Sequence, residues 1–318
     1  MKINILIFLM MVLSSSIFAT TWDEPWHNEV VKTADSFIHA RINSVNRRNG
    51  LDLTVIKTIS GKQVSGRISI TDFYLHNITS FSGNRDYFSV FQGATEAYFF
   101  IKQNQNGNYS IATPTTGFAI FHDGIVYATY RHSYHQASVS KDIYEKTMEA
   151  IFNNYHNQLY DIAYINEFIR NYIFQDPASP NSSDSNLFFM QHIALECIYH
   201  LRLPGYYSQI LSFLDPNTHF HAQVSAIRAL IAYNTDECKN ELLKIINAIN
   251  RDNFVQVMSI WILTEFKPTE LRHYLIELER NASTDNNGFG GNIMDPRVGT
   301  YIPSVRIAIQ NLINSLWC

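Results

Sequence analysis

Three stretches in the C-terminal half of the sequence repeat one pattern: Ile193–Leu201 (IALECIYHL), Ser225–Tyr233 (SAIRALIAY) and Met258–Phe266 (MSIWILTEF). They align without gaps at offsets of 32 and 33 residues. Three positions of the pattern are apolar or aromatic in every copy: Leu195/Ile227/Ile260, Ile198/Leu230/Leu263 and Leu201/Tyr233/Phe266. Their spacing places them on one face of a helix. A pattern that recurs with this period predicts an array of similar helical units.

A second apolar stretch follows each copy at the same offsets, so each unit is predicted to be a pair of helices. Its matching positions are Ile210/Leu242/Leu275, Leu211/Leu243/Ile276 and Phe213/Ile245/Leu278. A fourth copy lies in Pro303–Leu316, where Ile309 and Leu312 take the places of Ile260 and Leu263. The step from Ile260 to Ile309 is 49 residues, and the extra residues fall in an insertion, Asn281–Tyr301.

The array resembles HEAT-type helical repeats over residues 187–318. Val305-Arg306-Ile307-Ala308 and Ala226-Ile227-Arg228-Ala229-Leu230 are similar to the first-helix pattern of that family. The resemblance implies an α-solenoid, in which each helix pair buries its apolar stripe against its neighbours. It also implies an extended surface offered to another macromolecule, an expectation that rests on fold analogy.

Two more amphipathic stretches, Lys141–Asn157 and Gln158–Tyr172, precede the array. Their apolar residues recur at helical spacing, which predicts a helical pair over residues 141–174. Residues 175–186 contain almost no apolar side chain and include two prolines, a composition typical of a linker.

Short stretches separated by turn residues dominate the N-terminal half and predict β-strands. Asn49-Gly50 and Asp123-Gly124 are strong turn signals, because tight hairpins need a positive φ at their central residues. The expected strands are residues 36–45, 51–60, 67–75, 97–103, 109–112, 118–122 and 125–131. They predict a small antiparallel β-barrel or sandwich over residues 20–140. The expected fold class is therefore α+β with two domains.

This half resembles secreted OB-type barrels of the netrin-module and tissue-metalloproteinase-inhibitor class over residues 34–131. Val55–Lys62 (VIKTISGK) is similar to the lysine-glycine turn after their second strand, and Phe91–Ile101 (FQGATEAYFFI) to the stretch that enters their fourth. Those inhibitors present an N-terminal cysteine to the protease zinc. The expected mature start here, Thr20-Thr21-Trp22-Asp23, has no cysteine, so the resemblance implies the barrel and not the inhibition.

The first 19 residues predict a Sec-type signal peptide and hence a periplasmic or extracellular protein. A lysine at position 2 is followed by the apolar stretch Ile5–Leu13 and by small residues up to Ala19. The apolar stretch is well short of the roughly 20 residues that a membrane span needs. No later stretch reaches 18 consecutive apolar residues, so no further membrane segment is expected.

The composition excludes some classes of protein. The 318 residues carry a net charge of −4, with 16% charged and 46% hydrophobic residues. These values argue against a disordered chain and against a dedicated nucleic-acid binder. With three cysteines, Cys197, Cys238 and Cys318, at least one thiol lies outside any intramolecular bridge. Whether any two of them pair is left open by the sequence.

No catalytic signature occurs in the sequence, and no cofactor is expected. It has no His-Glu-x-x-His zinc motif and no Gly-x-Ser-x-Gly elbow. The close histidine pairs are His132/His135 and His219/His221. The simplest interpretation makes His132 and His135 exposed loop residues. The alternative makes them metal ligands together with a distant carboxylate, because a zinc site needs three or four ligands.

We therefore expect an exported, non-enzymatic protein-binding or scaffold protein that uses its helical-repeat surface. The candidate partner-binding residues are polar positions of the second helices and one aromatic residue of the insertion: Gln209, Lys244, Arg272, His273, Glu277 and Phe289. The alternative function is a secreted or periplasmic metal-dependent hydrolase with its site between the two domains, using His132 or His135. A protein partner is expected, and the oligomeric state is left open.

Overall fold

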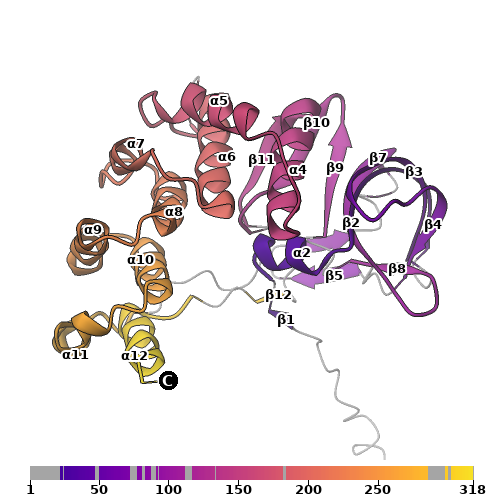
Figure 1. The fold of residues 1–318 in the computed structure, drawn as a ribbon. Coiled ribbons are helices and arrows are strands. Elements are labelled where there is room, and N and C mark those ends of the chain that lie inside the picture. The colour runs from indigo at the N-terminus through magenta and orange to yellow at the C-terminus, as the bar shows by residue number, and fades with distance from the viewer. Residues whose placement is uncertain are drawn as a thin grey trace, which may run out of the picture.

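The computed structural model describes residues 22–23, 25–46, 50–71, 77–80, 83–86, 91, 93–111, 117–132, 134–181, 184–285, 298–299 and 302–317. The fold is mixed α+β, with a β-barrel region in the N-terminal half and helices in the C-terminal half (Figure 1). This confirms the α+β class. The predicted signal peptide, residues 1–19, lies outside the described residues.

Five strands close the barrel: β2 (Ser36–Asn46), β3 (Gly50–Gly61), β4 (Gly66–Ile70), β8 (Tyr109–Ser110) and β7 (Glu96–Gln103). They pair in that order, and the barrel closes because β7 pairs with both β8 and β2. All pairs are antiparallel except β4 with β8. Strand β2 shifts register three times against β3, and such bulges bend a strand as closure requires.

Three further strands extend the sheet beyond β7: β9 (Phe118–His122), β10 (Ile125–Thr129) and β11 (Gln136–Ser140). The β9–β10 hairpin turns at Asp123 and Gly124, whose φ angles are 49° and 82°, as the Asp-Gly signal predicts. Strand β11 is short and contains two serines, and no pattern in the sequence predicted it. Short two-stranded pairs form between β5 (Asn77–Ser80) and β6 (Gly83–Asp86), and between β1 (Trp22–Asp23) and β12 (Val298–Gly299).

Strand β7 is buried on both faces, which explains its almost continuous apolar sequence. Ala97, Phe99 and Ile101 point into the barrel and belong to its core. Tyr98 and Phe100 point to the other face, where they join the larger core that the helices form. Strand β7 therefore separates two apolar cores, one inside the barrel and one between the outer face of the sheet and the helices.

Helices cover that outer face of the sheet and continue away from it in two rows (Figure 1). The helices α2 (His27–Thr33) and α4 (Lys141–Tyr155) pack on the sheet, and α5 (Ile162–Ile173) packs on α4 and on the helix that follows it. One row then contains α6 (Ser185–Leu201), α8 (Phe220–Ala229), α10 (Asn253–Glu265) and α12 (Val305–Ser315). Beside it lie α7 (Tyr207–Ser212), α9 (Asp236–Asn247) and α11 (Arg272–Asn281).

Most of the apolar positions that match between repeats are buried, as the pattern predicts, and the remaining ones are half-buried: Leu211, Tyr233, Ile276 and Leu278. Leu195, Ile227 and Ile260 occupy equivalent places on α6, α8 and α10, and none of them is exposed. Ile309 and Leu312 do the same on α12. In the second row Ile210 and Leu242 are equally buried. Successive helices of the first row pack on one another, so these side chains form a continuous core.

The segment expected to be a linker is tied to α6 by one buried side chain. The Gln191 Oε1 atom accepts a hydrogen bond from the Ala178 backbone N–H at 2.8 Å. Its Nε2 atom donates to the carbonyl of Asp176, also at 2.8 Å. Ala178 itself is only 9% exposed. The described part of this segment is therefore held against the helices, which its polar composition did not indicate.

Candidate functional site

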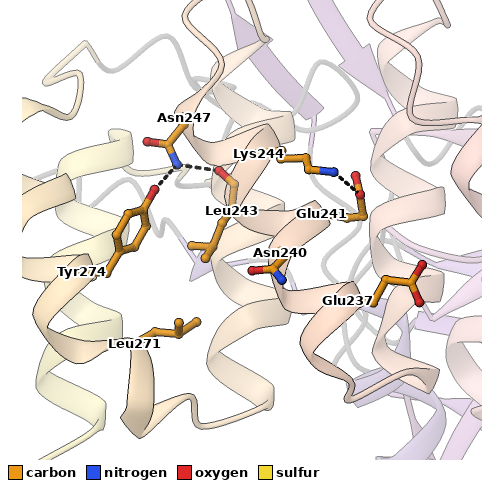
Figure 2. A pocket seen from close by; sticks show the side chains of 8 residues that line it. All are labelled: Glu237, Asn240, Glu241, Leu243, Lys244, Asn247, Leu271 and Tyr274. Carbon is orange, nitrogen blue, oxygen red and sulfur yellow. Dashed lines mark hydrogen bonds and ion pairs between the residues drawn. The ribbon is translucent and has the colours of Figure 1, made fainter.

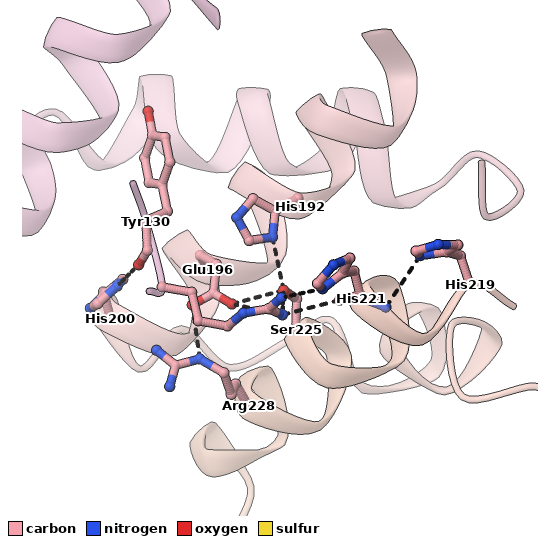
Figure 3. Close-up of polar contacts among 9 residues, drawn as sticks. Tyr130, His192, Glu196, His200, His219, His221, Ser225 and Arg228 are labelled. Carbon is pink, nitrogen blue, oxygen red and sulfur yellow. Dashed lines mark hydrogen bonds and ion pairs between the residues drawn. The ribbon is translucent and has the colours of Figure 1, made fainter. Parts of the chain in front are cut away.

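A cluster of buried polar residues lies where the connection between β10 and β11 meets α6 and α8 (Figure 3). The connection contributes Arg131, His132, Tyr134 and His135; α6 contributes His192, Glu196 and His200; and the start and body of α8 contribute His219, His221, Ser225 and Arg228. We call these residues the junction cluster. Strand β11 pairs with β10 and packs on α6, which draws the connecting residues beneath the helices.

Glu196 is the anionic centre of the junction cluster. Its Oε2 atom accepts from Arg228 Nε at 3.0 Å, and its Oε1 atom accepts from Ser225 Oγ at 2.8 Å. Arg131 Nη1 donates to the same Oγ at 2.8 Å and lies 3.9 Å from Glu196 Oε1. Glu196 and Arg228 are 32 residues apart, so the ion pair joins equivalent positions of two successive repeats.

Two guanidinium groups share this one carboxylate, and aromatic faces surround the excess positive charge. The Arg228 Cζ atom lies 3.6 Å from the centre of the Tyr199 ring and 5.2 Å from that of Trp26. The Arg131 Cζ atom lies 5.3 Å from the centre of Tyr134. Ring faces carry negative electrostatic potential, so they stabilise buried cations. The helix α2 thus contributes to the junction through Trp26, which directly precedes it.

The histidines of the junction cluster pack against one another. The His135 ring stacks on His221 with centroids 4.1 Å apart and meets His192 edge-on at 4.3 Å. Burial lowers the pKa of His135, His192 and His200 well below the usual value, and neighbouring cationic and histidine side chains lower it further. His27 on α2 contacts the His200 ring, and burial together with Arg228 lowers its pKa to about 3.

The interpretation of His132 and His135 as exposed loop residues is wrong. They are 1% and 7% exposed, because the β10–β11 connection lies under α6 and α8 rather than in solvent. The two histidine pairs, treated separately in the sequence, meet through His135 and His221. The N-cap of α8 is His219, whose ring accepts a hydrogen bond from the His221 backbone N–H.

The junction cluster does not have the geometry of a Ser-His-carboxylate catalytic triad. Ser225, His192 and Glu196 lie within hydrogen-bond distance, but the carboxylate contacts the serine and not the histidine that it would have to orient. The exposed fraction of Ser225 is zero. Within the described ranges, no three His, Cys, Asp or Glu side chains are placed so that they could hold a metal ion. The metal-site alternative on His132 and His135 thus has no described set of ligands.

A surface groove lies between α9 and α11, with a volume of about 1090 Å³ (Figure 2). Its lining residues are Glu237, Asn240, Glu241, Leu243, Lys244, Asn247, Leu271 and Tyr274. Asn247 Nδ2 donates to the Tyr274 hydroxyl at 2.8 Å and to the Leu243 carbonyl at 2.7 Å, which fixes one end of the groove. Lys244 pairs with Glu241 on the same helix. The Tyr274 side chain remains 43% exposed.

The residues predicted for partner binding do not lie together on one surface of the structure. Lys244 lines the groove. His273 and Glu277 are exposed on α11 outside the groove lining, and Gln209 is half-buried on α7. Arg272 is half-buried, with its Cζ atom 3.2 Å from the centre of the Trp317 ring. Phe289 lies outside the described residues.

Most of the groove was missed by the sequence analysis. Glu237, Asn240, Lys244 and Asn247 recur at intervals of three or four residues, which places them on one face of α9. That spacing was the available signal. Apolar stripes mark only the buried face of a helix, and the polar residues of the groove lie on the other face of α9. The sequence position of Tyr274 did not indicate a surface site, because a tyrosine on a repeat helix can also pack in the core.

The cysteines offer no reactive site within the described chain. Cys197 and Cys238 are buried free thiols, and Cys318 lies outside the described residues. Burial raises the pKa of both thiols, that of Cys238 to about 12, so neither forms the nucleophilic thiolate at neutral pH. Among the described residues, no helix is long and apolar enough to cross a membrane.

Comparisons with known proteins found no relative of this chain. No protein-family model matches the chain, and no curated protein or solved structure is significantly similar to it.

Proposed function

We propose that the chain is an exported, non-enzymatic protein that binds an extended segment of a partner protein in the groove between α9 and α11. The observation that carries this proposal is the groove itself, which combines an exposed tyrosine and two leucines with polar side chains from one helix face. Binding sites of this kind need an apolar contact for affinity and polar groups for orientation. The signal peptide predicted over residues 1–19 supports the proposed export.

In this proposal the helical region is a HEAT-like solenoid that presents the groove on its surface. Equivalent positions of successive repeats are buried, and the ion pair between Glu196 and Arg228 also joins equivalent positions. Stacked helix pairs leave one row of helices on an extended surface. The groove lies between two helices of that row, α9 and α11. In the same proposal the N-terminal half is an OB-type barrel, supported by its closed circuit of five strands.

The groove has the length and polar groups for a short extended segment. Its lining on α9 runs from Glu237 to Asn247, which corresponds to about 15 Å along a helix axis. A fully extended chain of about five residues spans that distance. Asn240 is exposed, and a carboxamide offers the donor and the acceptor that one peptide group can bond. We therefore assign the groove to a peptide backbone with alternating side chains.

The charges around the groove favour a basic segment. Four carboxylates lie on or beside it, those of Asp236, Glu237, Glu241 and Glu270. Two lysines accompany them, Lys239 and Lys244. The excess is negative, and complementary charge directs both encounter and register. The proposed partner segment accordingly carries lysine or arginine side chains between apolar ones.

The binding test compares three classes of labelled peptides of about 12 residues, long enough to fill the groove with flanking residues. The classes combine apolar residues with basic, acidic or uncharged polar ones, and fluorescence polarisation reports binding to the purified protein. We expect binders only in the basic class. Replacing the groove tyrosine, Tyr274→Ala, is expected to weaken them at least about tenfold, because an aromatic contact is lost.

The matched control is Tyr127→Ala, since that tyrosine on β10 is 46% exposed and far from the groove lining. It should leave peptide affinity unchanged. Equal binding of all three peptide classes, or equal losses in the two tyrosine variants, contradicts the proposal.

A further inference from the structure

The junction cluster forms the polar contact between the sheet and the first row of helices. Arg131, which follows β10, donates to the His221 carbonyl at 3.1 Å and to Ser225 Oγ on α8. His200 on α6 reaches back to the Tyr130 carbonyl, with its Nε2 atom 2.7 Å away. His27 on α2 has its backbone N–H bonded to the Arg131 carbonyl at 2.9 Å. These bonds link three helices to one connection of the sheet.

The hydrogen bonds of the cluster require neutral imidazoles. Ser225 donates its one proton to Glu196, so the His192 Nδ1 atom at 2.9 Å must be the donor to Ser225 Oγ. In the neutral ring the His192 Nε2 atom is then the unprotonated nitrogen, and it is buried and without a hydrogen-bond partner in the described chain. The His221 Nδ1 atom lies 2.9 Å from Arg131 Nη2, and a guanidinium only donates. A proton on either of these acceptor atoms has no acceptor to bond.

The charges that face the histidines also oppose protonation. The connection supplies Arg131 with Tyr134 and His135; α8 supplies Arg228 with His219 and His221; α6 supplies Glu196 with Tyr199, His192 and His200; and α2 supplies His27. Two cations face one anion among these groups. Each proton added to a histidine therefore increases an existing excess of positive charge in a buried site.

We propose that the junction cluster is a proton-operated latch: in mildly acidic surroundings, protonation of its buried histidines releases the β10–β11 connection from α6 and α8 while the sheet and the helices keep their secondary structure. This proposal is independent of the groove and its partner. The release is local, because the hydrogen bonds of the histidines join this connection to the two helices, whereas the apolar core that the outer face of the sheet shares with the helices stays packed.

The direction of the effect follows from the pKa shifts. The pKa of His135, His192 and His221 is lowered by burial in the closed form and returns toward about 6.5 when water reaches the rings. The histidines therefore favour the closed form fully above about pH 6.5, and the equilibrium shifts toward the open form as the pH falls below that value. Each such histidine shifts the opening equilibrium by up to about tenfold per pH unit.

The test titrates the purified protein from about pH 8 to about pH 4.5, a range that covers the histidine window. Trp26 and Trp261 pack edge-on in contact with the cluster, with ring centroids 5.8 Å apart, so tryptophan fluorescence reports opening. Far-ultraviolet circular dichroism reports secondary structure on the same samples. We expect a fluorescence transition above about pH 5 with the dichroism unchanged, and an uptake of at least about two protons per molecule.

Variants separate the latch from general acid sensitivity. His135→Phe keeps an aromatic ring but removes a titrating group, so the fluorescence midpoint should move to lower pH. His273→Phe is the matched control, because His273 is exposed on α11, and its midpoint should match the unmodified protein. If His135→Phe does not fold, the proton uptake of the unmodified protein tests the proposal instead. Loss of dichroism together with fluorescence, an uptake below about one proton, or an equal shift in the control overturns the proposal.

Discussion

Replacing Glu196 with glutamine is expected to lower the free energy of unfolding by about 3–5 kcal/mol, although the side chain keeps its size. The change removes the one carboxylate that bonds Arg228 directly and faces Arg131, and both guanidinium groups remain buried. An unpaired buried charge costs far more than the pair contributes, because water can no longer solvate it. Chemical denaturation of Glu196→Gln beside the unmodified protein measures the difference.

A matched control is Glu277→Gln on the exposed face of α11, which should change the same free energy by no more than about 0.5 kcal/mol. A double-mutant cycle with Arg228→Met isolates the pair. The double variant should lose less stability than the two single variants together, by about 0.5–3 kcal/mol, because the first change leaves a charge that the second removes. A loss below about 1 kcal/mol for Glu196→Gln would contradict the assigned role of this carboxylate.

Gly50→Ala is expected to destabilise the barrel by about 3 kcal/mol. The φ angle of Gly50 is +91°, and a Cβ atom there would lie 1.9 Å from the carbonyl oxygen of Ile70. A backbone atom cannot rotate away as a side chain can, so β3 and β4 would have to separate at the point where they pair. The free energy of unfolding from denaturant titration measures the loss.

Gly66→Ala provides the comparison, because Gly66 also has a positive φ, +74°, but no atom within 4 Å of its added Cβ. It should cost only the conformational penalty of about 1–2 kcal/mol. If the two alanine variants prove equally stable, the close approach between Gly50 and Ile70 is not what restricts position 50 to glycine.

The parts of the fold that periodicity determines were predictable from the sequence. The repeat positions Leu195, Ile227 and Ile260 are buried because an apolar stripe at helical spacing has no other stable place. The β9–β10 hairpin was predictable because Asp123-Gly124 specifies a turn locally. Strand β11 was not, since its polar residues are held by pairing with β10 rather than by their own preference.

The junction cluster was not predictable because it is assembled from distant segments. Arg131 and Ser225 are 94 residues apart, and nothing local in either segment indicates that a buried arginine will meet a serine. Glu196 and Arg228 form a partial exception. They occupy equivalent positions of two repeats, so the alignment that revealed the repeats also placed opposite charges side by side.

Reversal of the groove charge tests whether a basic segment binds between α9 and α11. The double variant Glu237→Lys/Glu241→Lys changes two lining side chains on one helix face. Isothermal titration should show that its affinity for the basic peptide falls by about tenfold or more. The same variant should bind the matched peptide, in which glutamates replace the lysines, more tightly than the unmodified protein does. A control reversal on α5, Glu167→Lys, should change neither affinity, because Glu167 is exposed outside the groove lining. If the double variant and the unmodified protein bind both peptides alike, the partner segment does not occupy this groove.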